Sequence, residues 1–202
     1  MSLKSLQPRT TALIIMILLA ATFRLLQSSS VFSILSNVTP VGAIALFGGC
    51  YFVDRWKAFM VPLLALFISD MLLNRIYYFD HWTFLYSGAY WIYGSFAVIV
   101  VLGHFIKNVT FLNVAVAGLS GAVIHWLISD FGVWMGGGTD ITTGLPFTRD
   151  FNGLLKCCYL ALPFLRNMAV GNLVFCGVLF GGFEWMQRKY PALRMQKAYS
   201  EI

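Results

Sequence analysis

The stretch that decides the fold runs from Thr110 to Met135 and reads TFLNVAVAGLSGAVIHWLISDFGVWM. Within it only His125 and Asp130 are ionisable, and nearly all the other residues are apolar or small. A run of about 20 mostly apolar residues is long enough to cross the hydrocarbon core of a bilayer as a helix. The stretch therefore predicts a transmembrane helix.

The composition of the whole chain extends this interpretation. Of its 202 residues, 59% are hydrophobic and 11% are charged, whereas soluble domains average roughly 45–50% apolar and about 25% charged residues. The apolar excess is too large for one buried core, and the length fits a single domain, residues 1–202. A soluble enzyme, a disordered chain, a coiled coil and a disulfide scaffold are all disfavoured. We expect an all-α integral membrane protein.

Five further apolar runs resemble the first. The six predicted spans cover residues 11–26, 38–53, 58–74, 84–106, 110–135 and 154–186. The last run is longer than a straight span requires, so we expect it to begin as an amphipathic stretch or to tilt. A basic tail precedes the first run, as in a signal peptide, but Arg24 interrupts the end of the run and no A-x-A site follows. We therefore expect this run to be retained as a helix.

The lysines and arginines predict the orientation, because they concentrate on the cytoplasmic side of membrane proteins. With the N-terminus inside, the inner side holds Lys4, Arg9, Arg55, Lys57, Lys107, Arg188, Lys189, Arg194 and Lys197. The outer side holds Arg24, Arg75, Arg149 and Lys156. We expect a multi-pass protein of the inner (cytoplasmic) membrane with both termini in the cytoplasm. The net charge of +6 then reflects topology and gives no support to a nucleic-acid partner.

This topology places the longer loops outside. Residues 27–37, 75–83 and 136–153 form the outer loops, whereas the inner turns span only 54–57 and 107–109. Long loops without regular structure are often lids or binding loops. We therefore look for function on the outer side.

Ionisable and amide side chains inside the predicted spans point to the same side. Asp70 lies near the outer end of the third span, His125 and Asp130 lie in the outer half of the fifth, and Arg166 and Asn167 lie in the sixth. Such residues are costly in a membrane and usually face a bundle interior or a wet cavity. One reading is a polar cavity open to the outside, with Arg166 as an anion or hydrogen-bond clamp. The other is an internal Asp–Arg pair that fixes helix register.

Aromatic residues are also concentrated toward the outer side. Tyr86 and Tyr90 lie at the start of the fourth span, and His81 lies in the loop before it. They fit an interfacial belt, although a belt should be present at both faces. They also fit a stacking wall for a flat or cyclic ligand. His81 is either a ligand or metal contact or a solvated loop residue.

Motifs for known chemistries are missing from the sequence. It contains no GxxxxGK[ST] phosphate loop, no HExxH and no GxSxG, and its four cysteines lack metal-type spacing. We predict no catalytic residue, no metal and no cofactor. Without an ATP site, the chain cannot power transport by hydrolysis on its own.

Several segments resemble the S components of energy-coupling-factor (ECF) transporters, the substrate-binding membrane subunits for vitamins. The resemblance rests on TPVGAIALFGG (residues 39–49), on 63–70 with its final Ser-Asp, on 84–103, and on ALPFLRN (residues 161–167) followed by Gly171 and Asn172. It covers nearly the whole chain, although the shared patterns are loose. It implies six helices and a vitamin or metal bound on the extracytoplasmic side.

The resemblance also bears on partners. S components work with a coupling membrane protein and two ATPases, and they dock through an AxxxA pattern on the first helix. Ala12, Ala20 and Ala21 do not form that pattern, which is compatible with a solitary member of the superfamily that does not dock to a standard module. Some solitary members resemble cobalamin carriers, so a corrinoid is the first expectation for the ligand.

The expected function is a membrane-embedded protein that binds a vitamin-like small molecule for uptake. The expected substrate-binding residues are Asp70, His81, Tyr86, Tyr90, His125, Asp130, Arg166 and Asn167. One alternative is an accessory structural subunit of a larger membrane complex. A less favoured alternative is a membrane-embedded enzyme that uses His125, Asp130 and Arg166.

Overall fold

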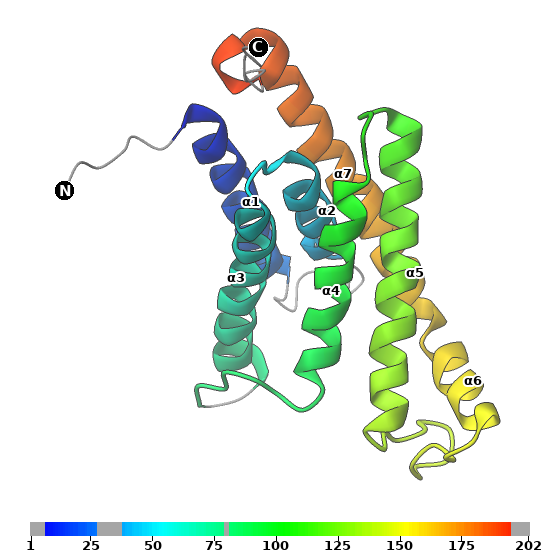
Figure 1. Cartoon of the computed structure of the whole chain (residues 1–202). Coiled ribbons are helices and arrows are strands. Elements are labelled where there is room, and N and C mark those ends of the chain that lie inside the picture. Colours follow the sequence, from blue (N-terminus) through cyan, green and yellow to red (C-terminus); the bar gives the residue numbers. More distant parts are fainter. Residues whose placement is uncertain (1–6, 28–37, 79–80, 195–202) are drawn as a thin grey trace.

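The computed structural model describes residues 7–27, 38–78 and 81–194, and in these ranges the regular elements are helices (Figure 1). They are α1 (Pro8–Gln27), α2 (Val41–Tyr51), α3 (Arg55–Leu73), the π-helical turn η2 (Asn74–Tyr78), α4 (Ala89–His104), α5 (Phe111–Met135), α6 (Phe151–Leu160), α7 (Leu162–Lys189) and the 3-10 helix η3 (Pro191–Leu193). Most of the first predicted outer loop, part of the second, Lys4 and Lys197 lie outside the described residues.

Four of the helices are long and apolar enough to cross a membrane: α1, α3 with η2, α5 and α7. The predicted all-α membrane architecture is thereby confirmed. Helices α2 and α4 are apolar but shorter, with 11 and 16 residues. At about 1.5 Å per residue, neither reaches the roughly 30 Å of a hydrocarbon core. The six predicted spans thus correspond to four long helices and two short ones.

The surface of the bundle also fits a bilayer. Large apolar side chains such as Leu19, Leu64 and Val178 are exposed on three of the long helices. Soluble monomers rarely expose contiguous apolar patches of more than a few hundred Å². The exposed apolar side chains therefore fit a membrane protein.

The first turn of α1 and the last turn of α7 lie at the same end of the bundle, which we call the terminal end (Figure 1). Nη1 of Arg9 donates hydrogen bonds to Oε1 of Gln187 at 3.0 Å and to the carbonyl oxygen of Leu193 at 2.8 Å. Helices α1 to α5 alternate in direction from there (Figure 1). The opposite end, which carries the α3–α4 and α5–α6 connections, is called the loop end.

Helix α2 is the centre of the packing. Ten of its 11 residues are buried, as expected for a helix that is apolar on every side. It packs against α3, α4 and α7. Its contact with α4 is so close that a Cβ at Gly49 would collide with the carbonyl oxygen of Val100. A Cβ at Gly103 would likewise collide with the carbonyl oxygen of Leu46. Small residues at such crossings let membrane helices approach.

Two predicted span boundaries are wrong. The run 154–186 is divided at Ala161 into α6 and α7, because Pro163 has no N–H to donate and its ring would clash with the carbonyl four residues earlier in a continuous helix. The run 84–106 becomes helical only at Ala89. Gly88 before it has a φ of 81°, a left-handed conformation that favours glycine and separates the helix from the preceding loop.

Candidate functional site

A cavity of about 300 Å³ lies in the half of the bundle toward the loop end. We call it the loop-end cavity. Residues from α1, α2, α3, α4, α5 and α7 line it, together with the chain before α2 and the loop before α4. Its polar lining residues are Arg24, Thr39, Tyr86, His125, Ser129 and Asp130. Aromatic rings of Phe96, Trp126 and Phe164 form much of the remainder. The lining thus combines a few polar groups with apolar and aromatic surface, as small-molecule sites do.

Arg24 is held at the edge of the cavity by a polar network on α3. Its Nη1 lies 2.6 Å from Oδ1 of Asp70 and donates a hydrogen bond to Oγ of Ser69 at 2.6 Å. The hydroxyl of Tyr93 donates to the other carboxylate oxygen of Asp70 at 2.9 Å. The positive charge of Arg24 is therefore neutralised inside the protein.

This network bears on the second interpretation of the polar residues, an internal Asp–Arg pair. An internal Asp–Arg pair is present, but the arginine is Arg24 at the end of α1 and not Arg166. The helices α1 and α3 pack against each other, and the C-terminal ends of both lie toward the loop end. Arg24 and Asp70 therefore lie at the same depth in the bundle.

His125 is fixed from α4. Its Nδ1 lies 2.6 Å from Oγ of Ser95, and its ring stacks on Phe96 at 4.7 Å between centroids. The hydroxyl of Ser95 donates its one proton to the carbonyl oxygen of Ile92 at 2.7 Å. In this arrangement Nδ1 of His125 carries the hydrogen that bonds to Ser95, and Nε2 is an acceptor.

Asp130 differs from the other charged groups of the cavity. No hydrogen bond or ion pair holds its carboxylate among the described residues. Helix α6 contacts this part of α5 through backbone carbonyl groups. Nε1 of Trp126 donates to the carbonyl oxygen of Cys158 at 3.2 Å, and Sγ of Cys157 lies 3.5 Å from the carbonyl oxygen of Asp130. The carboxylate lines the cavity and can accept hydrogen bonds from a ligand.

The structure brings together some of the predicted site residues. Tyr86, His125 and Asp130 line the cavity. Asp70 does not line it, but it forms an ion pair with Arg24, which does. Arg166 is exposed on α7, whose cavity-lining residues are Phe164, Leu165 and Met168. Tyr90 is 71% exposed and contacts Trp91. Neither His81 nor Asn167 belongs to the lining.

The functional residue that sequence reasoning missed is Arg24. It was counted as an outer-side charge, although a cation in the last turn of a predicted span is itself a signal of an internal partner. The partner could not be identified from sequence, because two carboxylates, Asp70 and Asp130, lie in the outer halves of the predicted spans.

The loop between α5 and α6 is ordered beside this site. The carboxylate of Asp140 pairs with Lys156 of α6, and its Oδ1 accepts hydrogen bonds from the backbone N–H and hydroxyl of Thr142 at 2.8 and 2.7 Å. Lys156 and Thr142 together hold the pKa of Asp140 well below its usual value. No three histidine, cysteine, aspartate or glutamate side chains gather as in a metal site within the part of the chain that the structure describes.

A family model with the description "Family of unknown function (DUF6580)" matches residues 4–193. The chain belongs to this family. Neither the search of curated proteins nor that of solved structures found a match. The DUF6580 match includes every helix of the structure, so the loop-end cavity and the Arg24–Asp70 pair both lie within the family region.

Proposed function

We propose that this DUF6580 protein binds a small solute in the loop-end cavity as the substrate-binding part of a membrane uptake system. The observation that carries the proposal is the Asp130 carboxylate, which lines a cavity among membrane helices and has no partner among the described residues. An ionisable group in such a place is costly and is usually retained for function. The cavity volume of about 300 Å³ lies at the lower end of the range for small-molecule sites.

The charges of the bundle support an outward-facing cavity. Arg9, Arg55, Lys107 and Arg188 lie toward the terminal end, the side that the positive-inside rule assigns to the cytoplasm. The cavity lies toward the other end. We propose six membrane crossings in the inner membrane, with α2 and α4 as short crossings, because the alternating course of α1 to α5 uses both of them.

The cavity lining favours a ligand with amine or N–H donors. Asp70 neutralises Arg24 at 2.6 Å, so Asp130 gives the cavity a negative charge when it is ionised, and a bound cation favours that ionised form over the neutral acid. Trp126 and Phe164 supply faces on which a flat ring or a cation can pack. A vitamin-like heterocycle with an amine has this chemistry. A corrinoid is a much larger macrocycle and would fit only if the cavity widened.

Uptake also requires a source of energy. The resemblance to S components supports a coupling membrane protein with ATPases as the partner, and the proposal includes that partner. The binding step itself can be tested on the purified chain.

The test is ligand binding to the wild type and to Asp130→Asn in detergent. We expect native mass spectrometry to find a co-purified small molecule, or a thermal-shift screen of amine-bearing heterocycles to find one that stabilises the wild type. Saturation at 100 times the Kd stabilises a protein by about 2.7 kcal/mol. Asp130→Asn should weaken binding by about tenfold or more, because it removes a charge-assisted hydrogen bond.

The matched control is Asp54→Asn, which removes a carboxylate at the terminal end, where Asp54 pairs with Lys57. This variant should bind as the wild type does. The absence of any stabilising ligand, or equal binding by Asp130→Asn and the wild type, would refute the proposal.

A further inference from the structure

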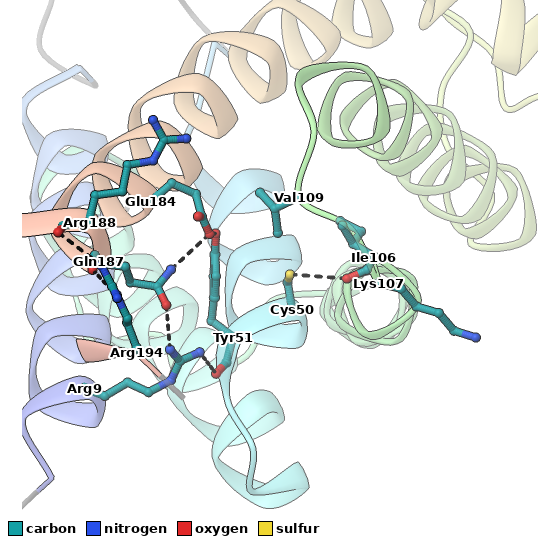
Figure 2. A pocket seen from close by; sticks show the side chains of 10 residues that line it. All are labelled: Arg9, Cys50, Tyr51, Ile106, Lys107, Val109, Glu184, Gln187, Arg188 and Arg194. Carbon is teal, nitrogen blue, oxygen red and sulfur yellow. Dashed lines mark hydrogen bonds between the residues drawn. The ribbon is translucent and has the colours of Figure 1, made fainter. Parts of the chain in front are cut away.

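A second hollow, of about 410 Å³, lies at the terminal end (Figure 2). We call it the terminal-end hollow. Its walls come from α1, the end of α2, the turn between α4 and α5, the last turns of α7, and Arg194, the residue after η3. Four of its lining side chains are cationic: Arg9, Lys107, Arg188 and Arg194. Glu184 is the single carboxylate among the lining residues.

Glu184 does not neutralise these cations by direct contact. Its Oε1 accepts a hydrogen bond from the hydroxyl of Tyr51 at 2.6 Å and another from Nε2 of Gln187 at 3.0 Å (Figure 2). Both donors are neutral. Within the described residues, none of the four cations forms an ion pair with Glu184, so the lining keeps an excess of positive charge.

Arg9 is the buried part of this charge. The residue is only 8% exposed, and its guanidinium lies 5.3 Å from the ring centroid of Phe183. Its hydrogen bonds go to neutral acceptors: the side chain of Gln187 and the carbonyl oxygens of Leu193 and Tyr51. Its Nε has no partner among the described residues. A buried cation without a bound anion is costly, so a nearby negative charge would stabilise it.

Lys107 and Arg188 flank the hollow on two sides and are exposed (Figure 2). No hydrogen bond or ion pair is made by either side chain within the described ranges. Lys107 is one of the lining residues, and in Figure 2 its ammonium extends away from the hollow. Arg194 is engaged through Nε and Nη2 with carbonyl oxygens of Gln187 and Arg188 at 2.9 and 3.3 Å. The rim thus carries two exposed cations, whereas Arg9 and Arg194 are hydrogen-bonded within the protein.

We propose that the terminal-end hollow binds a phosphate-bearing anion at the level of the membrane headgroups. Guanidinium groups match phosphate oxygens in geometry and charge. Basic pockets between membrane helices on the cytoplasmic side bind anionic headgroups. Cys50, Ile106 and Val109 give the other wall an apolar surface, which suits the glycerol and upper acyl carbons of a lipid. The phosphate belongs either to an anionic phospholipid or to a soluble phosphate compound.

The experiment compares two double variants with equal loss of charge. Lys107→Gln/Arg188→Gln removes both rim cations. The control, Arg55→Gln/Lys189→Gln, removes two cations at the same end that do not line the hollow; Lys189 is next to Arg188 and stacks on Trp185 and Tyr190 at 5.3 and 5.5 Å. Arg9 is left unchanged because its loss would disturb the packing of α1 on α7.

The first arm measures lipid retention by native mass spectrometry after exchange into phosphatidylglycerol or phosphatidylcholine. We expect the wild type and the control to retain phosphatidylglycerol preferentially, and the rim variant to lose this preference by about tenfold. The second arm measures the thermal shift caused by pyrophosphate in phosphatidylcholine nanodiscs. A shift that only the rim variant loses supports the proposal, with a soluble phosphate as the source. Equal behaviour of the two variants in both arms would overturn it.

Discussion

Arg24 and Asp70 show, at the scale of single residues, how this bundle holds opposite charges away from water. Their side chains are 18% and 6% exposed and lie 2.6 Å apart. Tyr93 satisfies the second carboxylate oxygen at 2.9 Å. Removing one member of a buried pair costs much more than replacing both, because the remaining charge is left without a partner.

Asp70→Asn is therefore expected to lower the free energy of unfolding by about 3 kcal/mol. The amide carries no charge and therefore cannot neutralise the guanidinium of Arg24. The measurement is equilibrium unfolding of the purified protein in mixed detergent micelles.

The double variant Arg24→Leu/Asp70→Leu serves as the control. It should be more stable than Asp70→Asn, since it removes both charges of the pair and leaves neither without a partner. If Asp70→Asn were as stable as the wild type, the pair would not carry the stability assigned to it here.

At the scale of elements, the loop between α5 and α6 depends on one carboxylate. Asp140 is buried and joins Thr142 of the loop to Lys156 of α6. Lys156 first, and Thr142 second, lower the pKa of Asp140. A carboxyl whose folded pKa is below its unfolded value of about 3.9 stabilises the fold fully above about pH 4, and the stabilisation is lost as the pH falls toward the folded pKa.

We expect Asp140→Asn to make the loop more sensitive to proteolysis and to lower the unfolding temperature at pH 7. The difference from the wild type should be smaller at pH 3, where the wild type loses part of the same stabilisation. Thermal unfolding of both proteins at the two pH values measures this.

Thr142→Val is the matched variant for the loop. It keeps the ion pair between Asp140 and Lys156 and removes one hydrogen bond. The decrease in unfolding temperature at pH 7 should therefore be smaller for Thr142→Val than for Asp140→Asn. A difference between Asp140→Asn and the wild type that is as large at pH 3 as at pH 7 would contradict the assignment.

At the scale of the whole molecule, the two ends of the bundle differ in charge, and the proposed orientation follows from that difference. After replacement of the four native cysteines, Ile141→Cys and Asn108→Cys place one thiol at each end. Ile141 is 81% exposed in the α5–α6 loop, and Asn108 is exposed in the α4–α5 turn. In intact cells a membrane-impermeant maleimide should label Ile141→Cys, whereas Asn108→Cys should react only after permeabilisation.

The labelling experiment has its own control. If the protein is inserted the other way, Asn108→Cys reacts in intact cells and Ile141→Cys reacts only after permeabilisation. Reaction of Asn108→Cys alone would reverse the orientation and place the loop-end cavity in the cytoplasm. Reaction of both thiols in intact cells would contradict a single orientation.

Particular residues show what sequence could predict about the candidate site and what it could not. His125 and Asp130 were selected because ionisable residues stand out in an apolar run, and both line the loop-end cavity. Arg166 was selected for the same reason, yet it is exposed. The depth of a residue along its helix can be read from sequence. The direction in which its side chain faces cannot be read when apolar residues surround the helix on nearly every side.

The membrane character and the helical class could be read from the sequence, because run length and apolar content are local properties that the bilayer selects directly. The break before Pro163 was not predicted, although the effect of a proline on a helix is local. Tertiary structure alone decided that α2 is the buried centre, that Arg24 is the partner of Asp70, and that Asp130 has no partner among the described residues. These outcomes depend on which helix faces pack together, and in a chain that is apolar almost throughout, the contacts between small residues and a few polar groups decide that choice.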